Sequence, residues 1–414
     1  MMLNKICRGR VNFNISLLLA FLRGWFKNKK QKAALVKEFE SGFAKYIGAD
    51  HAIAVSSAKT ALYLALKALG AKKGDEIIAP AYTVREVIDV IIIMGLIPVF
   101  VDINLKDANM DAGLIEARIS PKTKFMLMTH IYGCPCDIEE ILAISRKYNL
   151  VIIEDAAQAC GGEYKLKKTG SFGKIGYFSF GILKNLNTLG GGMIVTNDGL
   201  IAQFLRKDIE KFSNISNLEI LRRLWSVIAI AFFTQPLVFS VLVYPILYLC
   251  QKAGIKVFDK LFKAKGIKDF NLKRYNMKFS APQAAIGLLQ VANIDSINNA
   301  KINNAHILNK FLKGLLDIKI FPENNAKKNI YLNYVIRIKD RNKFIDCLFD
   351  QGFDVSPGQV ICCADQEDFS RFYWACPMSI KMEKENVYLP IYSPLNGRHM
   401  LEISAAVRGK SEKK

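Results

Sequence analysis

The order of apolar and polar positions divides the chain into regions with different patterns. Between residues 52 and 212, short apolar runs alternate with longer amphipathic segments. The apolar runs predict strands at 52–55, 76–79, 97–102, 124–130, 150–155, 175–180 and 192–196. The segments between them predict helices at 60–69, 85–94, 111–119 and 137–148. Such alternation indicates an α/β fold around a mostly parallel sheet, whose ligands bind where the strands end.

The segment 213–268 breaks this alternation. Its residues 224–250 include no charged side chain, and this length suffices for a membrane-spanning helix. Pro236 and Pro245 disturb helical hydrogen bonding, and basic residues flank both ends, so charge gives no orientation. Three interpretations stay open: a membrane-associated hairpin, burial at a dimer or domain interface, or a true span. A hairpin is favoured, since residues before and after the segment must reach one site.

Beyond the insertion, the pattern predicts a helix at 280–304, a strand at 333–338 and a helix at 341–351, as in a small α+β domain. We therefore expect a basic amphipathic segment, a large domain, an apolar insertion, a linking segment and a small C-terminal domain. Their predicted bounds are 1–37, 38–212, 213–268, 269–304 and 305–414.

The charge of the chain is concentrated near its beginning. The formal net charge is +21, and residues 1–37 contain nine lysines or arginines and no acid. A short apolar run there has Arg23 directly after it and no cleavage site, which disfavours a signal peptide. A basic helix on an anionic membrane surface and a helix packed on the core both remain open. In the membrane interpretation its buried side comprises Leu17, Leu18, Phe21, Leu22, Trp25 and Phe26.

Composition also excludes some classes of function. The basic residues come without a zinc-finger spacing or an RNA-binding aromatic motif, so we expect no nucleic-acid partner. None of the nine cysteines has the spacing of a metal or redox site. We expect reduced thiols, no metal, and a cytoplasmic location, with peripheral or monotopic contact to the inner face of the cytoplasmic membrane.

Two strand ends carry the residues of greatest chemical interest. Asp155 ends the apolar run 150–153, where a buried carboxylate needs a positive partner, and Gln158 follows it. A protonated pyridine nitrogen is such a partner; a helix cap or a metal ligand is the alternative. Lys184 follows the strand at 175–180 in apolar surroundings, and Ser179 precedes it. A lysine amine there can form a Schiff base and shuttle a proton, although most lysines are simply solvated.

A third motif lies where the first predicted strand meets a helix. Its sequence, Val55-Ser56-Ser57-Ala58-Lys59-Thr60, places hydroxyls and small residues at a helix N-terminus. Free amide groups there suit a cofactor phosphate, and an ordinary Ser/Thr cap is the alternative.

These motifs, in this order, resemble the DegT/DnrJ/EryC1/StrS family of pyridoxal-phosphate (PLP) dependent aminotransferases, which act mostly on nucleotide-linked keto-sugars. The resemblance covers about residues 35–212 and 270–405. Further matching stretches are 39–48, 74–80, 98–103, 130–133, 275–287 and 389–392.

The resemblance implies a fold-type-I homodimer with PLP at the subunit interface. Lys184 would hold the cofactor, Asp155 would pair with its ring nitrogen, and Gln158 would contact its phenolic oxygen. The phosphate would be held by Ser179, by the backbone amides of Ala58 and Lys59, and by Asn276 of the other subunit. Lysine at position 184 favours transamination, because dehydrating relatives carry histidine there.

Several positions depart from the family pattern. Ala58-Lys59 stands where Gly-Thr is usual, and Val84 stands where an aromatic ring normally stacks on the cofactor, with Tyr82 as a substitute. Gly190 replaces an acid, and Val355 to Gly358 replace a His-Tyr-Pro segment. Cofactor groups are mostly kept, so we expect glutamate or glutamine as amino donor and an unusual keto-sugar acceptor, lipid-linked or membrane-presented. The alternatives are a PLP-dependent dehydratase or other non-transaminating PLP protein, and a membrane-tethered binding protein.

Overall fold

The seven-stranded sheet forms the centre of the large domain. The computed structural model describes residues 5–11, 13–255 and 276–411. The strand order is β1-β10-β9-β6-β5-β2-β4, and β10 alone runs antiparallel to its neighbours. The strands are β1 (His51–Val55), β2 (Glu76–Pro80), β4 (Ile97–Val101), β5 (Thr123–Thr129), β6 (Val151–Asp155), β9 (Ile175–Ser179) and β10 (Gly192–Thr196). The mostly parallel α/β sheet predicted from the sequence is confirmed, strand by strand.

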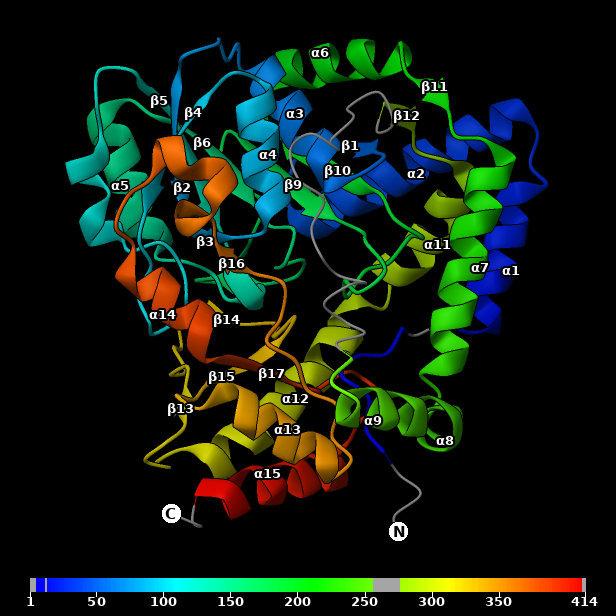
Figure 1. Cartoon of the computed structure of the whole chain (residues 1–414). Coiled ribbons are helices and arrows are strands. Elements are labelled where there is room, and N and C mark those ends of the chain that lie inside the picture. Colours follow the sequence, from blue (N-terminus) through cyan, green and yellow to red (C-terminus); the bar gives the residue numbers. More distant parts are fainter. Residues whose placement is uncertain (1–4, 12, 256–275, 412–414) are drawn as a thin grey trace.

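Helices cover both faces of this sheet (Figure 1). One face packs against α3 (Ala58–Ala68), α4 (Arg85–Ile93) and α6 (Gly199–Glu210). The other packs against α2 (Lys29–Ile47), α5 (Ile138–Tyr148) and α11 (Ala281–Val291). Both faces are therefore buried, which explains why the strands read as continuous apolar runs.

Two predicted helices differ in the structure. The helix expected at 111–119 consists of two short 3₁₀ turns, Ala112–Leu114 and Glu116–Arg118. Gly113 is a poor helix former, and Asp111 binds its amide at 3.0 Å, which favours a tight turn. The helix expected at 280–304 is broken: α12 (Ile294–Leu312) follows α11 after two residues, where Asn293 Nδ2 donates to the Leu289 carbonyl.

The small domain is built on a three-stranded antiparallel sheet. Its strands are β13 (Lys319–Ile320), β15 (Tyr334–Arg337) and β17 (Asn386–Leu389). Helices α12, α13 (Arg341–Asp350) and α15 (Gly397–Ser411) close one core with them, and Ile6 belongs to this core. Two short pairings join the domains: β14 (Lys327–Lys328) pairs with β7 (Glu163–Tyr164), and β16 (Ile361–Cys362) pairs with β3 (Tyr82–Thr83). The other short elements are β8 (Lys167–Lys168), β11 (Ser213–Asn214), β12 (Met277–Lys278) and α14 (Pro377–Glu385).

The apolar insertion forms helices beside the large domain. α7 (Asn217–Phe233) is followed by α8 (Pro236–Val238), a π-helical turn at Phe239–Val243, and α9 (Tyr244–Lys252). The predicted break at Pro236 is present, whereas Pro245 lies in the first turn of α9, where it costs no hydrogen bond. In the described part of the chain, no single helix has the length and hydropathy to cross a membrane. Taken together, the segments 217–233 and 236–252 do, but they are bent by 68°.

The N-terminal helix α1 (Ile15–Trp25) lies along α7 (Figure 1). Leu17 and Phe21 are buried in the cluster between the two helices. Leu22 and Phe26 are exposed. The predicted single apolar side was therefore wrong in its composition, because two of its six residues are buried in the core and Leu18 and Trp25 are partly buried against it.

Candidate active site

The carboxyl ends of the parallel strands bring the first functional residues together. The register of β6 places Asp155 beside Thr129 of β5 and Tyr177 of β9. Paired residues in a parallel sheet point to the same side, here the side covered by α3 and α4. The Asp155 side chain is buried and accepts a hydrogen bond from the Ala157 amide at 3.0 Å.

Lys184 lies on the loop after β9, five residues beyond Ser179. Its backbone amide donates to the Gly181 carbonyl at 2.9 Å, which fixes the turn. Burial lowers the pKa of the Lys184 amine to about 8, and the charges of Asp155 and Glu86 oppose this shift. A fraction of this amine is therefore neutral and nucleophilic near neutral pH.

The charge of Asp155 responds to the same neighbours. Burial raises the pKa of its carboxyl group, whereas the Tyr177 hydroxyl, the Ala157 amide and the charge of Lys184 lower it. Burial, and the charge of Asp155 beside it, raise the pKa of the Tyr177 hydroxyl in turn. A stronger cationic partner would stabilise the charged form of a buried carboxyl group whose pKa is raised.

The N-terminus of α3 supplies a place for an anion. Ser57 caps the helix by accepting from the Thr60 amide at 3.1 Å, and the first turn contains no acid. The amides of Ala58 and Lys59 lie in the first turn of α3, at the positive end of the helix dipole. Gly192 lets β10 approach this turn: a Cβ atom there would lie 2.6 Å from the Phe178 carbonyl and 3.0 Å from the Ala58 amide.

Buried polar contacts brace the loops around Asp155. Gln158 Oε1 accepts from the Tyr132 amide at 3.0 Å, which holds its side chain among the strand ends. On the other side of β6, the carboxylate of Glu154 accepts from His130 Nε2 at 2.8 Å and from three amides of the loop 170–173. These contacts fix the strand that presents Asp155.

Two of the sequence-predicted residues are placed differently from the rest. The Tyr82 ring is fully buried, and its hydroxyl group contacts Tyr132 and Asn386. It has no exposed face to offer a cofactor, which argues against its predicted stacking role, and Val84 contributes no aromatic ring. No contact among the described residues joins Asn276 to Asp155 or Lys184, although its side-chain oxygen is buried without a partner.

Sequence reasoning missed a second buried amine, Lys301 on α12. Its Nζ donates to Asn185 Oδ1 at 2.6 Å and to the Leu332 carbonyl at 3.1 Å. Burial lowers the pKa of this amine to about 7, with a smaller effect from the charge of Lys184. A signal was present, because Lys301 lies in the buried stripe of α12, between Asn298 and Ala305, where solvated lysines do not belong.

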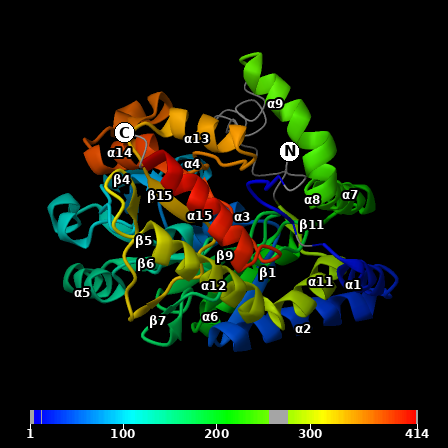
Figure 2. The ribbon, with the colours of Figure 1, turned by 90° about the horizontal axis from the view of Figure 1, so that it is seen from below.

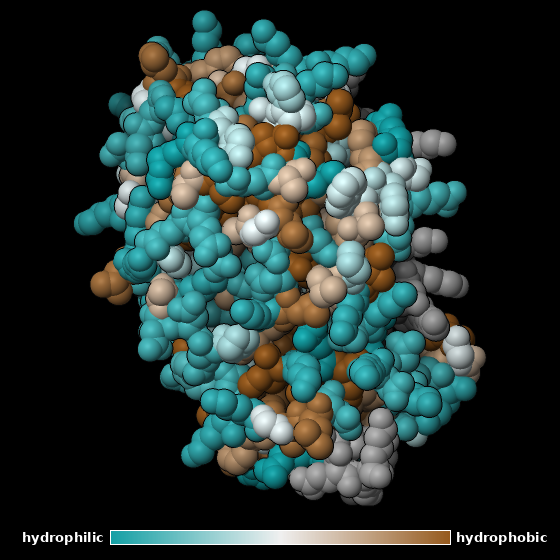
Figure 3. Space-filling view, turned by 90° about the vertical axis from the view of Figure 1, so that its left-hand side faces the viewer, coloured by the Kyte–Doolittle hydropathy of each residue, from teal (hydrophilic) through white to brown (hydrophobic). Residues whose placement is uncertain are grey.

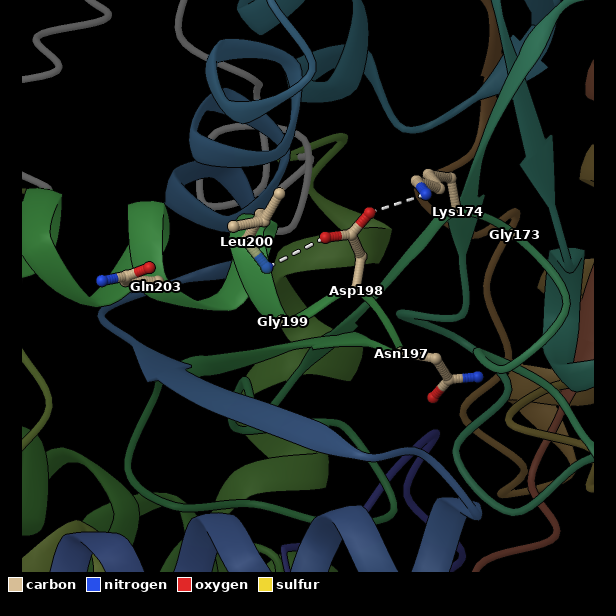
Figure 4. A pocket seen from close by; sticks show the side chains of 7 residues that line it. All are labelled: Gly173, Lys174, Asn197, Asp198, Gly199, Leu200 and Gln203. Atoms are coloured by element: carbon tan, nitrogen blue, oxygen red, sulfur yellow. Dashed lines mark hydrogen bonds and ion pairs between the residues drawn. The ribbon is translucent and has the colours of Figure 1, made fainter.

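A surface pocket of about 570 Å³ lies at the opposite end of β9 (Figure 4). Asp198 caps α6 there by accepting from the Leu200 amide, and it pairs with Lys174 at 2.7 Å. Lys174 precedes β9 whereas Lys184 follows it, so this pocket is at the wrong edge of the sheet for the residues above. The contacts in it are those of an ordinary helix cap.

Comparison with known proteins gives a family match over most of the chain. The model of the DegT/DnrJ/EryC1/StrS aminotransferase family matches residues 18–229 and 244–408. A GDP-perosamine synthase of Caulobacter vibrioides is 44% identical over 171 residues, which are 41% of this chain and 46% of that protein. One from Vibrio cholerae is 28% identical over 310 residues, 74% of this chain and 70% of that protein. The chain spans about half the length of several curated relatives that it matches.

Solved structures show the same fold. Helicobacter pylori PseC, an aminotransferase involved in the biosynthesis of pseudoaminic acid, superimposes with a TM-score of 0.78 at 18% identity, covering 99% of this chain and 100% of that one. An aminotransferase from Psychrobacter cryohalolentis gives a TM-score of 0.77 at 20% identity, covering 96% and 97%.

Proposed function

This chain belongs to the DegT/DnrJ/EryC1/StrS aminotransferase family, and we propose that it is a PLP-dependent aminotransferase acting on a keto-sugar. One observation carries the proposal. Lys184 and Asp155 come from different strands, yet they lie at one sheet edge within electrostatic reach of each other. The amine and the carboxyl group that this chemistry requires are therefore in one place.

The described residues fit PLP at each of its polar ends. The α3 N-terminus, with the amides of Ala58 and Lys59, would hold the phosphate, and Ser179 would add a hydroxyl group. Asp155, a buried carboxyl group beside the Tyr177 hydroxyl, would hold the ring nitrogen in its protonated state. Gln158 would orient the ring from the side.

When bound, PLP supplies an aldehyde that bonds to amines and a ring that accepts electrons. Lys184 would bind that aldehyde through Nζ while no substrate is present. Once released, its amine would take the proton from the amino-bearing carbon of the donor and deliver it to the aldehyde carbon of the cofactor, a task suited to a pKa of about 8. Asp155 would keep the ring nitrogen protonated throughout, because its own carboxylate is stabilised by that charge.

The donor and acceptor are finer parts of the proposal. We expect glutamate or glutamine as donor and a nucleotide- or lipid-linked keto-sugar as acceptor, in cell-surface glycan or secondary-metabolite synthesis. The GDP-perosamine synthases among the relatives support a sugar acceptor. A homodimer is proposed because Asn276, which makes no contact with Asp155 or Lys184 among the described residues, would complete the phosphate site of the second subunit through its Nδ2 donor.

The proposed location is the cytoplasm, with peripheral contact to the inner face of the cytoplasmic membrane. The exposed apolar helices of the insertion support that contact, since monomeric soluble enzymes rarely expose large apolar patches.

Absorption spectroscopy tests the function. The purified protein with PLP should absorb visible light, lose that band with glutamate or glutamine, and regain it when a keto-sugar is added. Isotopically labelled donor nitrogen should then appear in the sugar. A band that no amino donor changes would contradict transamination and favour a non-transaminating PLP protein. The absence of any band would favour a binding protein without cofactor.

A further inference from the structure

Apart from the last residues, 409–414, two segments of this chain fall outside the family match, namely residues 1–17 and 230–243. They are more than 200 positions apart, yet they contact each other. The Lys5 amide donates to Ser240 Oγ at 2.8 Å, and Arg10 donates to Gln235 Oε1 at 2.5 Å. Cys7 and Phe239 are buried in the same cluster. The additions to the family pattern therefore form one structural unit, together with the helices α1, α7, α8 and α9 to which they are joined.

This unit exposes apolar side chains at helical spacing. On α1 the exposed residues recur every three or four positions, and on α7 they recur every seven, opposite the side that packs on the protein. They are Ile15, Leu19, Leu22 and Phe26 around α1, Leu218, Trp225, Phe232 and Phe233 on α7, and Leu237, Val241, Leu242, Ile246 and Leu249 from α8 to α9. We call this set the apolar surface.

The side chains of the apolar surface are highly exposed for large hydrophobic residues. Phe26 is 80% exposed, Trp225 67% and Leu249 68%, while Leu224 and Val227 on the inner side of α7 are buried. In Figure 2, α9 projects from the body of the molecule on the side where α7 and α1 lie. The protein core is therefore packed without these side chains, and only a partner outside the folded chain could cover them.

The charge near the apolar surface indicates which partner. Four of the nine basic residues in 1–37 lie on α2, and Arg8 pairs with Asp354. Arg23 lies between Leu22 and Phe26 in the exposed stripe of α1. Arg222, which pairs with Glu219, lies between Leu218 and Trp225 in that of α7. Arginines among exposed apolar and aromatic residues are typical of helices that lie in the interface of an anionic membrane.

A second copy of this chain fits the surface less well. A two-fold contact places the same patch on both partners, so Arg23 in the exposed stripe of α1 would lie on both sides of the contact. Lipid phosphates instead attract this arginine. The 68° bend between α7 and the segment after Pro236 also prevents one straight span, but it does not prevent both helices from lying on a surface.

We infer that the apolar surface binds a bilayer containing anionic phospholipids, with α1, α7 and α9 lying in its interface. The inference deepens the proposed peripheral location and is independent of transamination. The apolar side chains of this surface enter the boundary between lipid headgroups and acyl chains, and its arginines stay at the level of the lipid phosphates.

Vesicle co-sedimentation of the full-length protein tests this. Wild type should sediment with phosphatidylcholine vesicles that contain phosphatidylglycerol, and less with phosphatidylcholine alone. The double variant Phe233→Asp/Leu237→Asp changes two exposed residues and should lose binding at least about tenfold, since each loses a buried apolar contact and gains a repelled charge. The control Leu316→Asp alters an 88% exposed leucine of the small domain and should bind as wild type.

Three results would overturn the inference. One is no sedimentation of wild type with the phosphatidylglycerol vesicles, and another is equal sedimentation of the double variant. The third is a lower mass of the double variant in analytical ultracentrifugation with vesicle binding unchanged, which would assign the surface to self-association. The glutamate-dependent change in absorption is measured on the same preparations, so failure of the lipid surface and failure of the proposed function are distinguishable.

Discussion

The sheet edge around Lys184 and the apolar surface are opposites in their chemistry. At the sheet edge, polar and ionisable groups are buried: Asp155 is 5% exposed, and burial shifts the pKa of both Asp155 and Lys184. On the apolar surface, large hydrophobic side chains such as Trp225 and Phe26 face the solvent. The face on the left of Figure 1 is mostly hydrophilic, with apolar residues in a band down its middle (Figure 3).

Both arrangements are unfavourable for an isolated chain. A buried charge and an exposed apolar side chain each cost free energy unless something else compensates. Each region therefore indicates a partner that the folded chain alone does not provide, a charged cofactor in one case and a lipid surface in the other. The two regions should also respond independently to substitution, which the following experiments test.

The largest effect is expected for Lys184→Ala. Without this amine no covalent bond to the cofactor can form, and the proton transfer loses its base, so kcat should fall by about a thousandfold or more. Borohydride reduction followed by mass spectrometry measures the bond. Lys174→Ala is the matched control, because Lys174 precedes the same strand and should keep full activity. A reducible adduct that persists in Lys184→Ala would refute the assignment.

Asp155→Asn should reduce kcat by about a hundredfold while PLP is retained. The amide keeps an oxygen that can accept from Ala157 but removes the negative charge, and a lost buried charge partner is worth about 3–5 kcal/mol. Activity and bound cofactor are measured separately. If vesicle binding fell as well, the two regions would not be independent, and the comparison above would fail.

Lys301→Met should change how stability depends on pH in the cofactor-free protein. The folded-state pKa of about 7 lies below the ordinary 10.5, so between these values the unfolded chain binds more protons. The free energy of unfolding therefore rises with pH in this window, and this added stability is lost as pH falls toward 7. In the variant, the increase of the free energy of unfolding with pH should be about half as large, since Lys184 contributes the remaining half. Thermal denaturation from pH 7 to 10 measures it, with Lys310→Met, exposed on the same helix, as the control.

The smallest effect is expected for Asp198→Ala, which lies in neither region. Loss of this cap of α6 and of its pair with Lys174 should cost about 1 kcal/mol, a fall in Tm of about 2 °C. Activity and vesicle binding should stay at wild-type levels. A large loss of activity would show that the pocket of Figure 4 belongs to the functional machinery.

Prediction from sequence was most accurate where the pattern is local. The strand run 150–155 and the helix 85–94 are within one residue of β6 and α4, because a buried strand and an amphipathic helix have different periods. It failed at 111–119, where a glycine and a capping aspartate favour short turns over an α-helix. Lys301 was missed because its charge suggests solvent, while its place in a helix stripe that becomes buried depends on α12 packing across the strand ends.

The sequence by itself determined the alternating elements, the order of the motifs and the residues of the proposed cofactor site, because apolar period and residue type are properties of neighbouring positions. Only the tertiary structure decided which side of α1 is covered, that residues 5–11 meet the bend after α7, and that Tyr82 is enclosed in a tyrosine cluster. These outcomes depend on which surfaces far apart in the chain bury each other, and no local pattern contains that information.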